Sequence, residues 1–336
     1  MLPRLDARPD GPRLKSPSRR LKARSAALRA SRPQRPREPG LHSSLLLAAL
    51  VATMLLGACR DGDSNDAGAR AGAPALAADG AANQSEQPRD FGEPNDLQIR
   101  PGVLVQSDNG SCTSNFLYYT SAERFFIGAA AHCFSPDTNS GIDPCEGANA
   151  PLGSSVEIEN ARQPGTLAYS SWTAMQERGE TPGSNACTYN DFALVEIDPR
   201  DLDNVHPAAI FYGGPTGRLG GLAEVGDAVY TYGQSPFHVG VQTLQTKEGE
   251  ISAIVGEGWS YSVVTDNPGL SGDSGSAVLH ESGQALGILA TVGLGLGPIG
   301  QSPVVNGVTN FERAVDYAQP YFGGRLRLAT WPVTSF

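Results

Sequence analysis

From about residue 97 onward, the chain alternates short apolar runs with clusters of Gly, Pro, Asn and Asp. Short runs bounded by turn residues are typical of the strands of β-sandwiches and β-barrels. The runs cover residues 116–119, 125–127, 156–158, 193–197, 229–232, 285–289 and 303–305. Only residues 311–321 place apolar side chains at helical spacing. With 40 Gly and 25 Pro among 336 residues, the pattern predicts an all-β, turn-rich fold with one short C-terminal helix.

The N-terminal 58 residues differ from the rest of the chain. Residues 1–40 hold 12 of the 25 Lys and Arg, and residues 45–58 form an almost uninterrupted apolar run. That run is too short to cross a bilayer as a helix. A basic segment, a short apolar run and small residues together predict a signal peptide over residues 1–58. The whole chain has a net charge of −10, which argues against nucleic acid as a partner.

The end of the apolar run indicates how the exported chain is held. Residues 56–59, Leu-Gly-Ala-Cys, resemble the lipobox of bacterial lipoproteins, which implies that Cys59 is lipid-modified and anchors the protein to a membrane of the cell envelope. The alternative is an ordinary signal peptide, a secreted product and an incidental Cys59. Residues 59–96 contain few large apolar side chains, so we expect a flexible linker, or alternatively a removable pro-segment.

Four cysteines remain after Cys59, and an even number in an exported chain predicts disulfides. Four cysteines allow three pairings. Proximity in the sequence favours Cys112–Cys133 and Cys145–Cys187. The C-x-x-C spacing typical of zinc sites is absent from the sequence, so we expect no metal.

Three segments carry the residue types of nucleophilic catalysis. Residues 128–133 read Gly-Ala-Ala-Ala-His-Cys, residues 190–194 read Asn-Asp-Phe-Ala-Leu, and residues 269–278 read Gly-Leu-Ser-Gly-Asp-Ser-Gly-Ser-Ala-Val. A serine hydroxyl is a weak nucleophile that needs a base within hydrogen-bond reach and a third group to orient the base. The glycines around Ser274 allow a sharp turn in which the N–H groups of Gly272 and Ser274 converge on one oxyanion.

These segments resemble those of chymotrypsin/trypsin-like serine proteases, in the same chain order of His, Asp and Ser. The resemblance implies that His132 is the general base, Asp191 its orienting partner and Ser274 the nucleophile, with Gly272 and Ser274 as the oxyanion hole. It also implies two antiparallel six-stranded β-barrels, about 97–205 and 206–322, within a protease domain of residues 97–336. The expected activity is hydrolysis of proteins or peptides through an acyl-enzyme, without a cofactor. The sequence leaves the oligomeric state open.

Two departures from the family pattern bear on activation and specificity. No Ile/Val-Val/Ile-Gly-Gly segment follows a basic residue, so we do not expect cleavage to free an N-terminus that pairs with Asp273. We expect a preformed site instead. Asp273 itself is expected to be structural. The specificity pocket implied by the resemblance involves Pro268, Ala290, Val292 and Gly307, which are uncharged and therefore favour small or apolar substrate residues.

Other interpretations compete with the enzyme. A catalytically weak, protease-like binding protein of the cell envelope is the main alternative, although such proteins usually lose one of the three residues. An α/β-hydrolase is excluded because Ser276 breaks the G-x-S-x-G motif and the order of the triad differs. Residues 295–300 fit G-x-G-x-x-G and residues 137–143 resemble a calcium loop, but we expect an ordinary loop and a turn. His206, His238 and His280 are expected to be ordinary surface or core residues.

Overall fold

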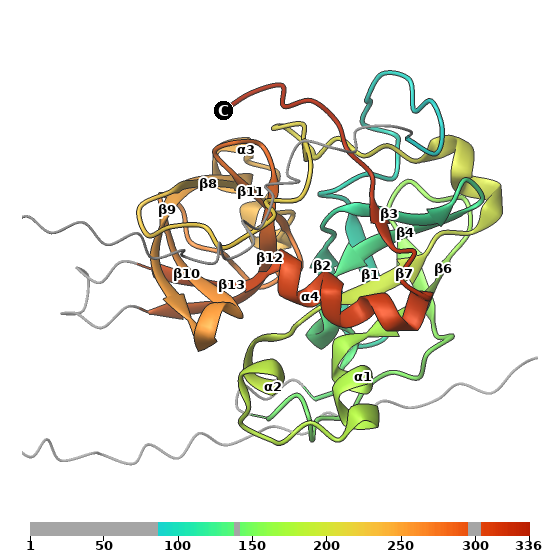
Figure 1. Ribbon diagram of the computed structural model, residues 1–336. Helices are drawn as coiled ribbons and strands as arrows, with labels where there is room; N and C mark the ends of the chain where they lie inside the picture. Colours follow the sequence, from blue (N-terminus) through green and yellow to red (C-terminus); the bar gives the residue numbers. More distant parts are fainter. Residues whose placement is uncertain (1–86, 138–141, 295–303) are drawn as a thin grey trace, which may run out of the picture. The chain divides into compact units, whose positions relative to one another are not determined.

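The computed structural model describes residues 87–137, 142–294 and 304–336, all within one compact unit that spans Pro74–Phe336. The expected signal peptide, Cys59 and residues 60–86 of the expected linker lie outside the described residues. So do most of the candidate calcium loop (138–141) and the G-x-G-x-x-G segment. Two bodies of β-structure stand side by side, and helix α4 (Phe311–Ala318) runs along both of them (Figure 1).

The first body is an eight-stranded antiparallel sheet that curls without closing. Its spatial order is β14-β3-β4-β7-β6-β5-β1-β2. The strands are β1 (Leu104–Ser107), β2 (Gly110–Thr113), β3 (Leu117–Ser121), β4 (Arg124–Ala129), β5 (Ser155–Ile158), β6 (Gly165–Ser170), β7 (Ala193–Glu196) and β14 (Arg327–Leu328). The predicted hairpin is present, because β3 pairs with β4 in a register that places Leu117 opposite Ile127.

The second body is a closed six-stranded barrel in the order β10-β13-β12-β11-β8-β9. Its strands are β8 (Ala228–Tyr232), β9 (Thr246–Val255), β10 (Ser260–Thr265), β11 (Ala277–His280), β12 (Ala285–Leu294) and β13 (Val304–Asn310). The short strand β11 pairs with β8 on one side and with β12 on the other, which places the loop before β11 at one end of the barrel.

Short helices connect the strands. The α-helices are α1 (Ser171–Arg178), α2 (Asn185–Tyr189), α3 (Gln242–Gln245) and α4, and the 3-10 helices are η1 (Ala131–Phe134), η2 (Pro199–Asn204), η3 (Pro236–His238), η4 (Gly256–Gly258) and η5 (Gln319–Phe322). The predicted C-terminal helix is therefore present as α4 continued by η5. Asn310 caps α4, since its side chain accepts a hydrogen bond from the Arg313 N–H.

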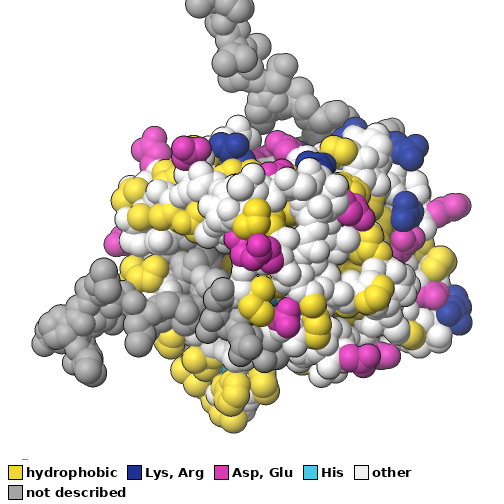
Figure 2. Space-filling model, turned by 90° about the horizontal axis from the view of Figure 1, so that it is seen from below, with side chains coloured by type: hydrophobic (Ala, Val, Ile, Leu, Met, Phe, Trp, Pro, Cys, Tyr) yellow, Lys and Arg dark blue, Asp and Glu magenta, His cyan; other side chains and the backbone are white. Residues whose placement is uncertain are grey.

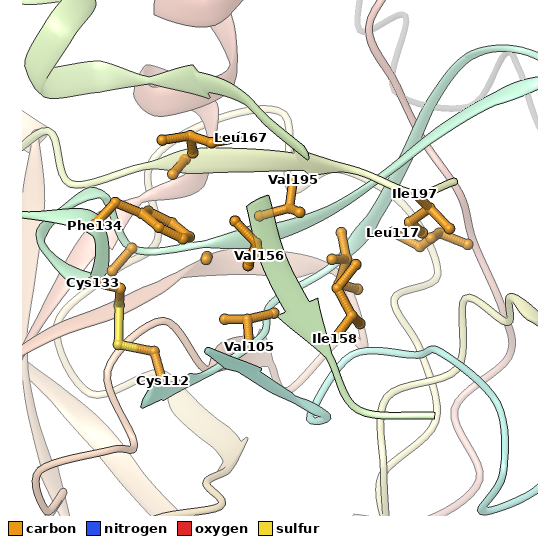
Figure 3. Close-up of a cluster of buried hydrophobic side chains, with 14 of the residues drawn as sticks. Val105, Cys112, Leu117, Cys133, Phe134, Val156, Ile158, Leu167, Val195 and Ile197 are labelled. Atoms are coloured by element: carbon orange, nitrogen blue, oxygen red, sulfur yellow. A yellow bond between two sulfur atoms is a disulfide. The ribbon is translucent and has the colours of Figure 1, made fainter. Parts of the chain in front are cut away.

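The curled sheet encloses a core of aliphatic and aromatic side chains. Val105, Val156 and Val195 come from three strands and point toward one another inside the sheet (Figure 3). The disulfide between Cys112 and Cys133 borders the same cluster (Figure 3). Burial of these side chains stabilises the body that carries two of the candidate catalytic residues.

The predicted all-β fold is confirmed. In its N-terminal half, however, the sheet does not close into the barrel that the resemblance implies. A closed six-stranded barrel was expected there, and the structure has a curled eight-stranded sheet whose edge strand β14 comes from the C-terminus. Arg327 pairs with Tyr119 in this added strand. The last residues of the chain thus return to the first body after the barrel is complete, which no local pattern in the sequence indicates.

The surface and the start of the described chain add three observations. Charged side chains are scattered among uncharged ones on the face shown in Figure 2. Residues 87–96, expected to belong to the linker, contact the domain, since Phe91 is buried and its ring meets that of Phe125 edge-on at 6.1 Å. Among the helices that the structure describes, none is long and apolar enough to cross a bilayer.

Candidate active site

His132 and Asp191 are brought together by the pairing of two neighbouring strands. Strand β4 ends at Ala129, just before His132, and β7 begins at Ala193, just after Asp191; these two alanines are partners in the register. The His132 backbone N–H donates to Asp191 Oδ1 at 2.9 Å, and Nδ1 lies 2.6 Å from Oδ2. Because Nδ1 donates its hydrogen to the carboxylate, Nε2 is left as the proton acceptor.

The Asp191 carboxylate also tunes the basicity of His132. Burial lowers the pKa of His132, because desolvation disfavours the imidazolium ion. The negative charge of Asp191 and its hydrogen bond raise the pKa by more, so that the pKa lies above the ordinary value of 6.5. The imidazole is thereby held in the tautomer and with the basicity that a general base requires.

Two hydroxyl groups that the sequence did not single out hold the Asp191 segment in place. Ser171 Oγ accepts a hydrogen bond from the Phe192 N–H at 3.0 Å and donates to the Asn190 carbonyl at 2.8 Å. Thr309 Oγ1, from the other body, donates to the Tyr189 carbonyl at 2.7 Å. Ser171 begins α1 and Thr309 lies near the end of β13, and single Ser and Thr residues at such positions carry no signal in one sequence. Only the fold identifies these contacts.

Ser274 lies in the loop before β11 and lines the same cavity as His132 and Asp191. This cavity has a volume of about 1150 Å³. Within the described residues, the Ser274 hydroxyl makes no hydrogen bond to His132. Hydrogen bonds of this kind are often long or poorly aligned before substrate binds and tighten in the complex. The structure therefore gathers all three candidate catalytic residues at one cavity, with the His–Asp contact already formed.

The backbone around Ser274 presents two unpaired donors. The N–H groups of Asp273 and Gly275 are bonded, to the carbonyls of Leu270 at 2.8 Å and Leu289 at 2.7 Å. The N–H groups of Gly272 and Ser274 have no acceptor in the part of the chain that the structure describes. Gly272 has a φ of +102°, and a Cβ there would lie 2.9 Å from Pro236 Cδ, so that this turn requires glycine.

Thr113 ties the two bodies together beside this loop. Its N–H donates to the Ser274 carbonyl at 2.9 Å, and its hydroxyl donates to the Gly272 carbonyl at 2.7 Å. The same hydroxyl accepts a hydrogen bond from the Gln234 N–H at 2.8 Å. Thr113 is fully buried at the end of β2 and was not predicted as a site residue. It fixes the loop of the barrel that carries Ser274 against the sheet that carries His132 and Asp191.

The residues expected to form the specificity pocket are only partly together. Ala290 and Gly307 line the cavity beside Ser274, together with Thr291, which belongs to the same expected pocket wall as Ala290. Pro268 is exposed and is not among the residues that line it. The side chain of Val292 lies outside the described part of the structure.

Disulfides join Cys112 to Cys133 and Cys145 to Cys187, the pairing that proximity in the sequence favours. The first bridge connects β2 to η1, the turn that contains His132. The second connects the segment near Asp143 to α2, which ends two residues before Asp191. Both covalent links therefore support segments that place candidate catalytic residues.

Comparison with known proteins identifies one family model that matches the chain. Residues 102–288 match a family model described as the trypsin-like peptidase domain. A search of curated proteins finds no match. A solved structure of a glutamic acid-specific serine protease shares 17% identity over 68% of this chain and 100% of its own, with a TM-score of 0.41. A Glu endopeptidase shares 16% identity over 66% of this chain and 91% of its own, with a TM-score of 0.38. A mutant of Rv3671c from M. tuberculosis shares 14% identity over 66% of this chain and 86% of its own, with a TM-score of 0.37.

Proposed function

Because the chain belongs to the family of trypsin-like peptidase domains, we propose that it is a serine endopeptidase that acts through His132, Asp191 and Ser274. The observation that carries the proposal is the 2.6 Å contact between His132 Nδ1 and Asp191 Oδ2 at the cavity that Ser274 also lines. A base oriented by a carboxylate, next to a serine at a cavity, is the arrangement that acyl transfer requires.

The reaction follows from the atoms at hand. Ser274 Oγ attacks the carbonyl carbon of the peptide bond while His132 Nε2 takes the hydroxyl proton. The oxygen of the tetrahedral intermediate accepts hydrogen bonds from the N–H groups of Gly272 and Ser274, which lack another acceptor within the described residues. The C–N bond then breaks, and the imidazolium gives its proton to the leaving amine. A water molecule, deprotonated by His132, hydrolyses the acyl-enzyme and regenerates Ser274.

The decisive experiment replaces the nucleophile. We expect Ser274→Ala to lower kcat for a peptide substrate by at least about 10³-fold, since the oxygen that forms the acyl-enzyme is gone. The variant is also expected to lose covalent labelling by a peptide phosphonate, while circular dichroism and thermal unfolding stay as in the wild type. Ser252→Ala, an exposed serine on β9, is the matched control and should retain full activity. Equal turnover by Ser274→Ala and wild type would refute the mechanism.

The same experiment separates the enzyme from its alternative, a protease-like binding protein. A binding protein would bind peptides without turnover, and neither the wild type nor the variant would react with the phosphonate. The wild type is expected to be labelled at a single serine, identified by mass spectrometry of the digested protein.

The part of the cavity that the expected pocket residues line supports a preference for uncharged substrate residues. Ala290, Thr291 and Gly307 line it, and a Cβ at position 307 would lie 2.2 Å from Thr291 Oγ1, so that only glycine leaves this space free. No acidic or basic side chain lies among these three. We therefore expect cleavage after small or apolar residues, and digestion of a peptide library read by mass spectrometry reports this preference directly.

We further propose that the protein is exported and held at the cell envelope by a lipid on Cys59. Two disulfides in one domain favour an oxidising compartment, and the residues before Cys59 have the pattern of a lipoprotein signal. Cys59→Ser is expected to release the protein from the membrane fraction, because a serine cannot receive the thioether-linked lipid. The wild type should stay with the membranes through a high-salt wash. A Cys59→Ser protein that remains membrane-bound would contradict lipidation.

A further inference from the structure

A buried cluster of charged side chains adjoins the nucleophile loop. His238 Nε2 lies 2.9 Å from each oxygen of the Asp273 carboxylate, and Lys247 Nζ lies 3.0 Å from Oδ2. The side chains of His238 and Lys247 are 1% exposed, and that of Asp273 is 0% exposed. Lys247 is also the only lysine in the sequence after Lys22. The domain thus places its single ammonium group in its interior, against the residue that precedes Ser274.

The backbone completes the surroundings of the carboxylate. The Ser235 N–H donates to Asp273 Oδ1 at 3.0 Å, and the Leu270 N–H donates to Oδ2 at 2.9 Å. A carboxylate offers about four acceptor sites, so these two donors together with His238 and Lys247 fill them. Lys247 Nζ in turn lies 3.3 Å from the carbonyls of Leu244 and Gln245. No further cation is needed to balance the buried charge of Asp273.

The position of this carboxylate bears on the direction of both N–H groups proposed for the oxyanion hole. Asp273 shares a peptide plane with Ser274, so a backbone rotation that released its side chain would also turn the Ser274 N–H. The Gly272 N–H lies in the peptide plane between Ser271 and Gly272, inside the turn from Leu270 to Asp273 that the Asp273 side chain braces. Leu270 and Asp273 are bonded in both directions, because the Asp273 N–H also donates to the Leu270 carbonyl at 2.8 Å. An unpaired carboxylate would not stay buried, since removal of one partner of a buried ion pair is strongly destabilising.

We propose that Lys247 and His238 act as positioning residues that hold Asp273 inside the barrel and thereby keep the oxyanion hole formed in the intact chain. This inference rests on the proposed function, because it assigns a role in the oxyanion hole of the same site. His238 was expected from the sequence to be ordinary, and the sequence did not single out Lys247. Together they supply Asp273 with the donors and the positive charge for which a freed N-terminal amine would otherwise be needed. The enzyme accordingly needs no cleavage at its N-terminus to become active.

The shape of the site supports an internal partner over an external one. A Cβ at Gly233 would lie 2.1 Å from Asp273 Oδ1, so the protein closes tightly around the carboxylate on that side as well. His238 lies at the end of η3 and Lys247 at the start of β9, only nine residues apart. One surface segment, residues 238–247, therefore supplies both groups, and its attachment to the barrel at β9 fixes their separation.

The test measures the oxyanion hole separately from substrate binding. Lys247→Met keeps the length of the side chain and removes the charge. We expect kcat to fall by about 100-fold, the scale of losing one oxyanion donor, with KM within threefold of the wild type. Affinity for a peptide boronate, which forms a tetrahedral adduct with Ser274, should fall in parallel with kcat. Lys247→Arg, which retains a cation, is expected to have a kcat at least tenfold higher than that of Lys247→Met.

Two further proteins keep this test decisive. Arg200→Met removes an exposed cation that pairs with Asp198, and it should leave kcat and boronate affinity unchanged. If Lys247→Met does not fold, the double variant Lys247→Met/Asp273→Asn avoids an unpaired buried charge, and we expect it to fold with kcat reduced at least tenfold. Wild-type kcat and boronate affinity in a folded Lys247→Met or in the double variant would overturn the positioning role.

The wild-type protein provides an independent measurement. Purified chain whose N-terminal residue is identified by mass spectrometry should hydrolyse peptide at the same rate wherever it begins before residue 87. Activity that arises only after a new N-terminus is cut would overturn the inference and leave the proposed function intact. Absence of both hydrolysis and phosphonate labelling in every form would instead refute the proposed function, and the positioning role with it.

Discussion

At the scale of single residues, the proposed mechanism makes the pH dependence of activity a consequence of the contact between His132 and Asp191. In the proposed mechanism His132 must be neutral to accept the proton of Ser274. Its pKa lies above 6.5 because the charge and hydrogen bond of Asp191 outweigh the effect of burial. We therefore expect kcat/KM to rise with pH through an apparent pKa above 6.5. Since the folded-state pKa is raised, the protonated pair also stabilises the fold at acid pH, and this contribution is lost as pH rises through that pKa.

Asp191→Asn isolates this effect. Removal of the carboxylate should shift the acid limb of the kcat/KM profile to lower pH and reduce kcat by about 10⁴-fold, since the amide no longer favours the correct tautomer or the imidazolium ion. Asp203→Asn, at an exposed acid, is the control and should leave the profile unchanged. The prediction fails if the acid limb of Asp191→Asn coincides with that of the wild type.

Sequence motifs identified the candidate catalytic residues because each combines a reactive side chain with a distinctive neighbourhood. Ala-Ala-His-Cys and Gly-Asp-Ser-Gly are such neighbourhoods, whereas the residues that support them have none. Ser171, Thr113 and Lys247 are common residue types in ordinary contexts. They meet the site only because strands distant in the sequence lie side by side, so single-sequence reasoning had no signal for them.

At the scale of elements, the two disulfides hold short segments that strand pairing alone leaves loose. The bridge between Cys145 and Cys187 closes a separation of 42 residues, and the bridge between Cys112 and Cys133 closes one of 21. Loop entropy predicts about 4 and about 3 kcal/mol of stabilisation, respectively. Helix η1 contains His132, and α2 ends two residues before Asp191. Loss of either bridge is therefore expected to affect catalysis as well as stability.

The corresponding double variants test this expectation. We expect Cys145→Ser/Cys187→Ser and Cys112→Ser/Cys133→Ser each to lower Tm by roughly 10 °C, the former by slightly more. Thermal unfolding is measured in parallel with kcat, and a reducing agent should bring the wild type toward both variants. Unchanged midpoints after removal of both cysteines of a bridge would contradict the argument from loop entropy.

Elements with clean apolar runs were predicted, and elements with mixed patterns were not. Strand β7 lies within the predicted run 193–197, and β8 covers the predicted run 229–232 and begins one residue before it. Strand β9 was missed because its first half has no apolar run: the exposed Glu248 and Glu250 alternate with Lys247 and Gly249. Helix α1 was missed because it follows β6 without an intervening residue, so the strand and helix periodicities run together.

At the scale of the whole molecule, the site depends on how the barrel is joined to the sheet. His132 and Asp191 belong to the sheet and Ser274 to the barrel, and Thr113 connects the two through hydrogen bonds to both Gly272 and Ser274. Thr113→Val keeps the shape of the side chain and removes the hydroxyl. The Gln234 N–H and the Gly272 carbonyl then lose a partner, which costs about 1–3 kcal/mol for each buried group left unsatisfied.

We expect Thr113→Val to lower kcat by about tenfold and to reduce the free energy of unfolding by about 2 kcal/mol, because the nucleophile loop loses its attachment to the sheet. The control is Thr216→Val, at a partly exposed threonine whose hydroxyl makes only a 3.4 Å contact with the Ser282 carbonyl. Chemical denaturation and steady-state kinetics measure the two effects. A Thr113→Val protein with wild-type kcat would show that this link does not position the loop.

The sequence by itself determined the all-β class, the C-terminal helix and the three residues proposed for catalysis, because these depend on local periodicity and on short motifs. Only the tertiary structure decided which groups support them. The pairing of β4 with β7 joins His132 to Asp191, and the contacts of Thr113 join the sheet to the nucleophile loop. The burial of Lys247 and His238 against Asp273 likewise depends on closure of the barrel. A charge becomes a partner for a buried carboxylate only when folding excludes water around both, and no local pattern in the sequence records that exclusion.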